Sequence, residues 1–139
     1  MHFEHQFFRS YVKLYRPVVN QLNKLLLHYD LYNAQWTILS LLSRKGEMTS
    51  AEIAEEQMME KPSVTKVVKR LHEMGYLDVT QGKDKREKLL SLSSEGQQIT
   101  KKIQEKLLPV YEQILAGIPE KEIHAAKQVL DHAYQNLTN

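Results

Sequence analysis

Apolar residues recur at spacings of three and four along most of the 139-residue chain, which is the pattern of amphipathic helices. The first such stretch predicts a long helix over residues 3–28, kinked or split by Pro17. Its apolar stripe begins almost at the first residue, so we expect this end to pack on something, such as another subunit. The stripe consists of Phe3, Phe7, Tyr11, Leu14, Val18, Leu22, Leu25 and Leu26.

Three shorter helices are predicted next. Residues 34–42 are apolar on most sides, as in a central buried helix, and Asn33 is the expected N-cap. Thr49 and Glu52 have the spacing of a capping box, which begins a short helix. The third helix extends from Pro62 to Glu73, is stopped by Gly75, and buries Val64, Val67, Val68, Leu71 and Met74.

The period then changes from helical to alternating. Residues 76–79 and 88–93 are short β-rich runs on either side of a polar turn, which predicts a hairpin. Ser93 can cap the helix that follows, and two amphipathic helices close the chain, over residues 97–115 and from Pro119 onwards. Their apolar positions are Ile99, Ile103, Leu107, Val110, Tyr111, Ile114, Ile123, Ala126, Val129, Leu130, Ala133 and Leu137.

This order of elements predicts a mostly α fold with a small β-hairpin wing. A three-helix unit closed by a hairpin is a winged helix-turn-helix, which we place at residues 33–96. One monomer offers little core to the long helices at residues 1–32 and 97–139, so we expect them to form a dimer interface within one compact domain.

Composition narrows the class of protein. Apolar residues make up 42% and charged residues 26% of the chain, as in an ordinary globular domain. The chain contains no cysteine, which excludes disulfides, thiolate metal sites and cysteine-based redox sensing. It has no apolar run of about 20 residues and no secretion signal at its start, so we expect a cytoplasmic protein without a membrane anchor.

Positive charge is concentrated in one segment, although the net charge is only +2. Eight basic and four acidic residues lie between Lys61 and Lys88, a local balance of +4 that is typical of a phosphate-binding face. Hydroxyl and cationic side chains share the exposed face of the predicted helix from Pro62, as in a helix that reads DNA. These are Ser63, Thr65, Lys66, Lys69 and Arg70, and the alternative is an ordinary solvated basic face.

The hairpin tip carries three cations, Lys83, Lys85 and Arg86, together with Asp84. An arginine on such a tip is attracted by the negative potential of a narrow minor groove. A carboxylate beside it would repel phosphate, so we interpret Asp84 as the partner that holds the Arg86 guanidinium in a fixed pose. The alternative is an ordinary charged turn.

Two stretches resemble the multiple antibiotic resistance regulator (MarR) family of transcription regulators. They are TSAEIAEEQMMEKPSVTKVVKRLHEMGYL (49–77) and DKREKLLSLSSEG (84–96), and the second resembles the family's wing signature, with Ser93 where Thr is commoner. The resemblance implies a homodimer on a pseudo-palindromic DNA operator with half-sites about 34 Å apart. It also implies that the helix from Pro62 enters the major groove, that Arg86 enters the minor groove, and that Thr49 and Ser50 contact phosphate.

The family resemblance further implies a repressor released by a small aromatic or anionic effector, without any cofactor. Such effectors bind where the dimerisation helices meet the DNA-binding lobe, and Tyr11, Tyr15, Tyr32 and Trp36 are the candidates in this chain. The alternative is that these four aromatic residues belong to the core.

The sequence gives little support to a metal site or to an enzyme active site. The six histidines do not have the spacing of a metal site, so we predict none. The chain has no phosphate-binding glycine loop, no G-x-S-x-G and no H-E-x-x-H, and we do not expect an enzyme. The remaining alternative is a winged-helix module that binds protein and has no ligand response.

Overall fold

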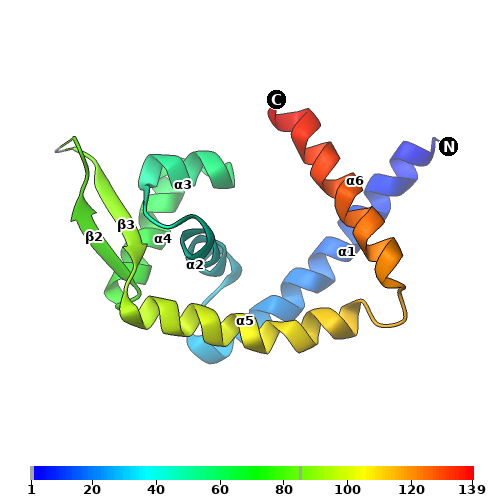
Figure 1. Ribbon diagram of the computed structural model, residues 1–139, viewed down its shortest axis with the longest axis horizontal. Helices are drawn as coiled ribbons and strands as arrows, with labels where there is room; N and C mark the ends of the chain where they lie inside the picture. The colour runs from blue at the N-terminus through cyan, green and yellow to red at the C-terminus, as the bar shows by residue number, and fades with distance from the viewer. Residues whose placement is uncertain (1, 85) are drawn as a thin grey trace. The chain divides into compact units, whose positions relative to one another are not determined.

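The computed structural model describes residues 2–84 and 86–139. The chain forms two compact units, Met1–Leu107 and Leu108–Asn139, with the long helix α5 belonging partly to each. The elements, labelled in Figure 1, are α1 (Phe3–Leu26), a 3₁₀ turn (Leu27–Tyr29), α2 (Asn33–Lys45), β1 (Met48–Thr49), α3 (Ser50–Gln57), α4 (Lys61–Glu73), β2 (Leu77–Gln81), β3 (Lys88–Leu92), α5 (Ser94–Ile114) and α6 (Glu120–Thr138). The predicted mostly α fold with a β-hairpin is confirmed.

Two details at the start of the chain differ from the prediction. Pro17 does not split α1, because Pro17 and Lys13 are both exposed and water can reach the carbonyl that lacks an N–H donor. Asn33 is the first residue of α2 and does not cap it. The Asn33 N–H instead donates to Oδ1 of Asn23 on α1 at 3.0 Å, and the Tyr32 N–H donates to Oε1 of Gln35 at 2.8 Å.

The sheet is antiparallel, with strand order β1–β3–β2. Met48 of β1 lies opposite Leu90 of β3, while Leu77 of β2 lies opposite Leu92. Strand β1 was not predicted, since two residues are too few to show a periodic pattern. The β2–β3 hairpin extends away from helices α2–α4, so its tip is free of the core (Figure 1).

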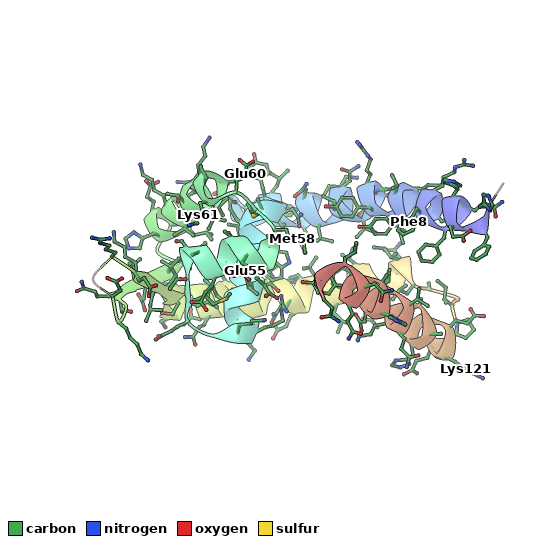
Figure 2. All side chains as sticks on the ribbon, turned by 90° about the horizontal axis from the view of Figure 1, so that it is seen from above. Phe8, Glu55, Met58, Glu60, Lys61 and Lys121 are labelled. Atoms are coloured by element: carbon green, nitrogen blue, oxygen red, sulfur yellow. The ribbon has the colours of Figure 1, made fainter. Side chains whose placement is uncertain are left out.

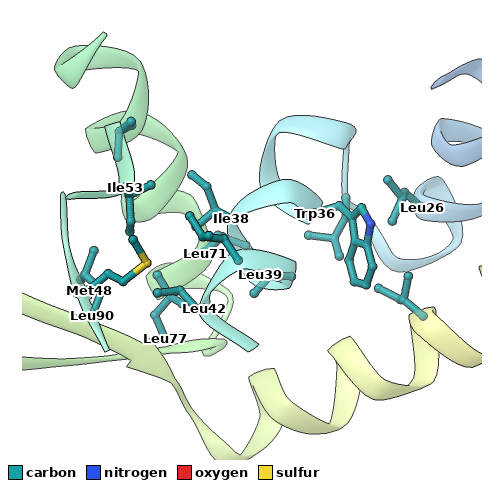
Figure 3. Packing of buried hydrophobic residues seen from close by; sticks show 14 of the residues in the cluster. Leu26, Trp36, Ile38, Leu39, Leu42, Met48, Ile53, Leu71, Leu77 and Leu90 are labelled. Atoms are coloured by element: carbon teal, nitrogen blue, oxygen red, sulfur yellow. The ribbon is translucent and has the colours of Figure 1, made fainter. Parts of the chain in front are cut away.

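One hydrophobic core lies among α2, α3, α4 and the base of the sheet (Figure 3). The predicted inward positions of α4 are confirmed: Val64 and Leu71 are completely buried, and Val67, Val68 and Met74 pack against the same core. Ile38 and Leu39 of α2 and Ile53 of α3 are completely buried as well. Leu22 and Leu26 at the end of α1 and Ile103 and Leu107 of α5 complete this core. The helix-turn-helix is therefore held by its own apolar side chains together with those of α1 and α5.

The helices near the two ends of the chain are largely uncovered. The apolar residues of the first half of α1 are exposed, and α6 has no buried residue. None of the helices in the described part of the chain is long and apolar enough to cross a bilayer.

Candidate nucleic-acid interface

Helix α4 presents a polar and cationic face because its apolar residues are used by the core. Val64 and Leu71 are completely buried, which turns the opposite side of the helix toward solvent. Pro62 near the start of the helix suits its first turn, where no internal N–H donor is needed. The exposed side carries all five predicted DNA contacts: Ser63, Thr65, Lys66, Lys69 and Arg70.

Two of these side chains have partners within the helix. The Thr65 hydroxyl donates to the Lys61 carbonyl at 3.0 Å, so its methyl group and a free lone pair remain available to a ligand. Arg70 lies 4.0 Å from the Glu73 carboxylate, and both side chains are about half exposed. Such a long exposed ion pair holds the guanidinium weakly, so DNA phosphate can displace Glu73.

Helix α3 begins with the predicted capping box. The Glu52 N–H donates to Thr49 Oγ1, and the Thr49 N–H donates to Glu52 Oε1, both at 3.1 Å. Thr49 and Ser50 are half-buried at this helix start. The Thr49 hydroxyl therefore stabilises α3 and still has its own proton for a phosphate oxygen.

The turn between α3 and α4 exposes residues that were not among the predicted DNA contacts (Figure 2). Met58 takes a left-handed conformation, with φ of 52°, and its side chain is exposed. Lys61 is the first residue of α4 and adds an exposed cation to its N-terminus, next to the N-cap Glu60. The prediction omitted Lys61 because Pro62 placed the helix start one residue too late.

The wing tip exposes Lys83, Asp84 and Arg86, whereas Lys85 lies outside the described residues. Asp84 Oδ1 accepts a hydrogen bond from the Arg86 backbone N–H at 3.1 Å, and the Asp84 carbonyl accepts one from the Glu87 N–H at 2.9 Å. Asp84 thus shapes the backbone of the turn. Its predicted contact with the Arg86 guanidinium is not among the interactions observed here and stays a prediction for the DNA complex.

The four aromatic candidates for an effector site do not share one pocket. Trp36 is buried in the core, as the alternative interpretation held, whereas Tyr11, Tyr15 and Tyr32 are about half exposed. The Tyr11 and Tyr15 rings lie 6.3 Å apart on α1. Together with Arg16 they line a shallow groove of about 410 Å³ that also involves Val12, Val19 and Asn20.

Histidine and carboxylate side chains do not gather into a metal site within residues 2–84 and 86–139. The nearest approach is a histidine–carboxylate pair on α6, where His124 Nε2 lies 3.5 Å from Glu120. Both side chains are largely exposed.

Comparison with known proteins supports the assignment of a nucleic-acid interface. The sequence profile described as MarR family matches residues 29–87. The uncharacterized HTH-type transcriptional regulator YwoH of Bacillus subtilis (strain 168) is 34% identical over 120 residues, which cover 86% of this chain and 85% of YwoH. The HTH-type transcriptional repressor IacR of Pseudomonas putida is 25% identical over 84% of this chain and 70% of its own length.

A solved structure has a similar fold. Staphylococcus aureus MarR in complex with salicylate and kanamycin superposes with a TM-score of 0.89, over 98% of this chain and 93% of that chain, at 24% identity. The winged helix-turn-helix fold predicted from the order of elements is thereby confirmed. The chain belongs to the MarR family of DNA-binding transcription regulators, which are not enzymes.

Proposed function

We propose that this regulator is a homodimeric repressor that binds a pseudo-palindromic operator and is released by a small aromatic or anionic molecule. Helix α4 enters the major groove, and the wing tip, with Arg86 foremost, enters the minor groove. Residues 33–96 form the DNA-binding lobe, and residues 1–32 and 97–139 form the dimer. An operator-binding protein works where the chromosome lies, so the proposal includes a cytoplasmic location.

The observation that carries the proposal is the exposed face of α4. Its hydroxyl groups and cations face solvent because Val64 and Leu71 anchor the opposite face in the core. Lys66, Lys69 and Arg70 can bind phosphates or the edges of purine bases. The hydroxyl groups of Ser63 and Thr65 can hydrogen-bond to phosphates or to base edges. A helix that is polar and cationic on one side and firmly packed on the other is well suited to insertion into a groove.

Dimerisation is supported by the uncovered apolar ends of the chain. The side chains of Phe3, Phe8 and Leu14 on α1 are more than half exposed, as are those of Leu130 and Leu137 on α6. Soluble monomers rarely expose apolar surface on this scale. A symmetric pair would cover these residues and present two α4 helices to adjacent turns of DNA.

Repression and release are supported by the relatives. IacR is named a repressor, and the S. aureus MarR structure holds salicylate, an aromatic anion. In this chain the α1 groove offers two tyrosine rings and the Arg16 guanidinium, a combination that fits an aromatic carboxylate. A second subunit would close this groove, which is open in the single chain.

The test is a fluorescence anisotropy titration of the protein against the DNA upstream of its own gene. We expect affinity to fall steeply between about 50 and 200 mM salt, because each phosphate contact releases counterions. Arg86→Ala should weaken binding by about tenfold or more, since a specific groove contact contributes about 1–3 kcal/mol. The backbone N–H that bonds Asp84 is kept in this variant, so the turn itself should survive.

The matched control is Lys121→Ala, which removes an exposed cation from α6, a helix that carries none of the proposed DNA contacts. It should leave operator affinity unchanged. A flat salt dependence would contradict DNA binding by this surface and favour a protein-binding module. Equal affinities for Arg86→Ala and wild type would remove the wing from the interface. Salicylate titrated into the complex tests release, and Arg16→Gln should reduce its effect.

A further inference from the structure

A single hydroxyl group connects the end of α4 with the beginning of α5. Ser93 lies between β3 and α5 and is buried. Its Oγ–H donates to the Gly75 carbonyl at 2.6 Å, and its oxygen accepts a hydrogen bond from the Gly96 N–H at 3.0 Å. The Ser93 backbone N–H donates in addition to the Tyr76 carbonyl at 3.0 Å. These four residues are called the joint below.

On one side, the joint holds the residues that end α4. Gly75 has a φ of 84°, a left-handed conformation that glycine adopts without strain. The Gly75 N–H donates to the His72 carbonyl and the Tyr76 N–H donates to the Leu71 carbonyl, which closes the helix. The Ser93 hydroxyl therefore holds the backbone at Gly75, where the chain turns away from the end of α4.

On the other side, the joint leaves no free space against α5. A Cβ atom at Gly96 would overlap the Tyr76 carbonyl oxygen and lie 3.0 Å from the carbonyl carbon. The first turn of α5 thus packs backbone against backbone onto the residue that follows α4. Steric contact and hydrogen bonding fix the same two segments independently.

Elsewhere α4 lies mainly against α2, α3 and β2. Helix α5 is fixed to the core further along, where Ile103 and Leu107 are buried. The joint is therefore the main direct connection between the DNA-facing helix and α5, the helix that continues into the second unit of the chain.

We propose that Ser93 is a positioning residue that transmits the orientation of α5 to α4 and the wing. A tilt of α5, caused by effector or by the dimer partner, moves the Gly96 N–H and with it the hydroxyl that holds Gly75. Ser93 touches no DNA in this proposal and acts only through α4. The inference rests on the proposed DNA binding, but the hydrogen-exchange part of its test does not require DNA.

The experiment compares Ser93→Ala with Ser94→Ala in the full-length protein. Ser94 is the exposed neighbour, so the control makes the same chemical change without breaking the joint. At a temperature where all variants are folded, Ser93→Ala should lose about tenfold in operator affinity, because the Gly75 carbonyl and the buried Gly96 N–H lose the hydroxyl that holds them together. Its affinity for unrelated DNA should stay unchanged, since the cations are intact. Ser93→Thr, which keeps a hydroxyl, should restore specific binding.

A purely structural role would lower the melting temperature but leave the ratio of specific to nonspecific affinity untouched, and that result would overturn the proposal. So would an equal loss in Ser94→Ala. Amide hydrogen exchange gives an arm without DNA: in Ser93→Ala the N–H groups of Gly96, Gly75 and Tyr76 should exchange faster together. Faster exchange at Gly96 alone would show that α4 is not coupled to α5. If the wild-type protein binds no upstream DNA, the proposed function is contradicted. The hydrogen-exchange result still tests whether the joint couples α4 to α5.

Discussion

The proposed DNA-binding lobe, residues 33–96, and the helices near the two ends of the chain differ in how far their apolar side chains are buried. In the lobe Ile38, Leu39 and Leu71 are 0% exposed. At the ends Phe3 is 76% and Leu137 is 84% exposed. Both regions contain amphipathic helices, so the difference lies in what covers their apolar faces.

This difference shows which part of the molecule is expected to depend on a second subunit. The core of the lobe is completed by Leu22 and Leu26 of α1 and by Ile103 and Leu107 of α5, and together with two hydrogen-bonded caps it holds α4 in place within one chain. Apart from Leu22, Leu26, Ile103 and Leu107, which reach the core, the apolar stripes of the ends are largely uncovered, and the free energy of burying them remains to be gained. Stability of the lobe should therefore not depend on protein concentration, whereas order at the ends should.

The largest effect is expected from Leu39→Ala in the core. Leu39 is completely buried, and truncation of such a residue costs about 2–5 kcal/mol through lost burial and the cavity left behind. Urea unfolding followed by circular dichroism should show this loss at every protein concentration. A destabilisation that disappears in concentrated protein would mean that the lobe, too, is held together by the dimer.

A smaller effect, of a different kind, is expected from Phe8→Ala on α1. Phe8 is 59% exposed in the single chain, and its burial in a dimer would contribute about 1.5–3 kcal/mol per subunit. Because both subunits lose this contact, about 3–6 kcal/mol per dimer, sedimentation equilibrium should show the dimer dissociating at a concentration more than about a hundredfold higher. Gln6→Ala, which alters an exposed polar residue on the same helix, should leave the dimer intact. Identical dissociation constants for Phe8→Ala and wild type would remove this face from the interface.

The same contrast explains how far the sequence could predict the structure. Helices α3 and α4 and the hairpin follow from local rules, the Thr49 capping box, Pro62 and Gly75, and these predictions are confirmed. Helix periodicity also identified the buried positions of α4, because a packed face leaves a pattern in the sequence. The exposed candidates followed from the same pattern, as the residues left on the other side.

The errors arose where distant residues decide local structure. Asn33 does not cap α2, since Asn23 of α1 supplies the oxygen from ten residues away. Strand β1 exists because Met48 finds Leu90 across the sheet. The exposure of Tyr11 and Tyr15 could not be predicted, because an apolar stripe has the same appearance whether its partner is the chain's own core or a second subunit. The joint at Ser93 was foreseen only as a helix cap; its bond to Gly75 bridges 18 residues.

An effect of about 1 kcal/mol is expected from Thr49→Ala at the start of α3. The variant loses the hydroxyl that accepts from the Glu52 N–H, and the free energy of unfolding should fall by that amount. Because α3 is only eight residues long, its first turn should also show faster amide exchange. Ser50→Ala is the neighbouring control, and an equal loss there would show that the cap is not the cause. Affinity for DNA should fall in both variants only if these hydroxyls contact phosphate.

The smallest effect is expected from Lys127→Ala on α6. Lys127 Nζ lies 2.7 Å from Asp131 Oδ2, one turn away, with both side chains more than half exposed. Exposed pairs of this spacing contribute about 0.3–0.5 kcal/mol, and salt weakens them further. The free energy of unfolding should therefore change by no more than this, and less in high salt. Helix α6 has no buried residue, so burial of its side chains stabilises it little in the single chain. A loss of several kcal/mol, measured in dilute protein where dimers are absent, would mean that α6 is stabilised within the monomer, and the contrast between lobe and ends would fail there.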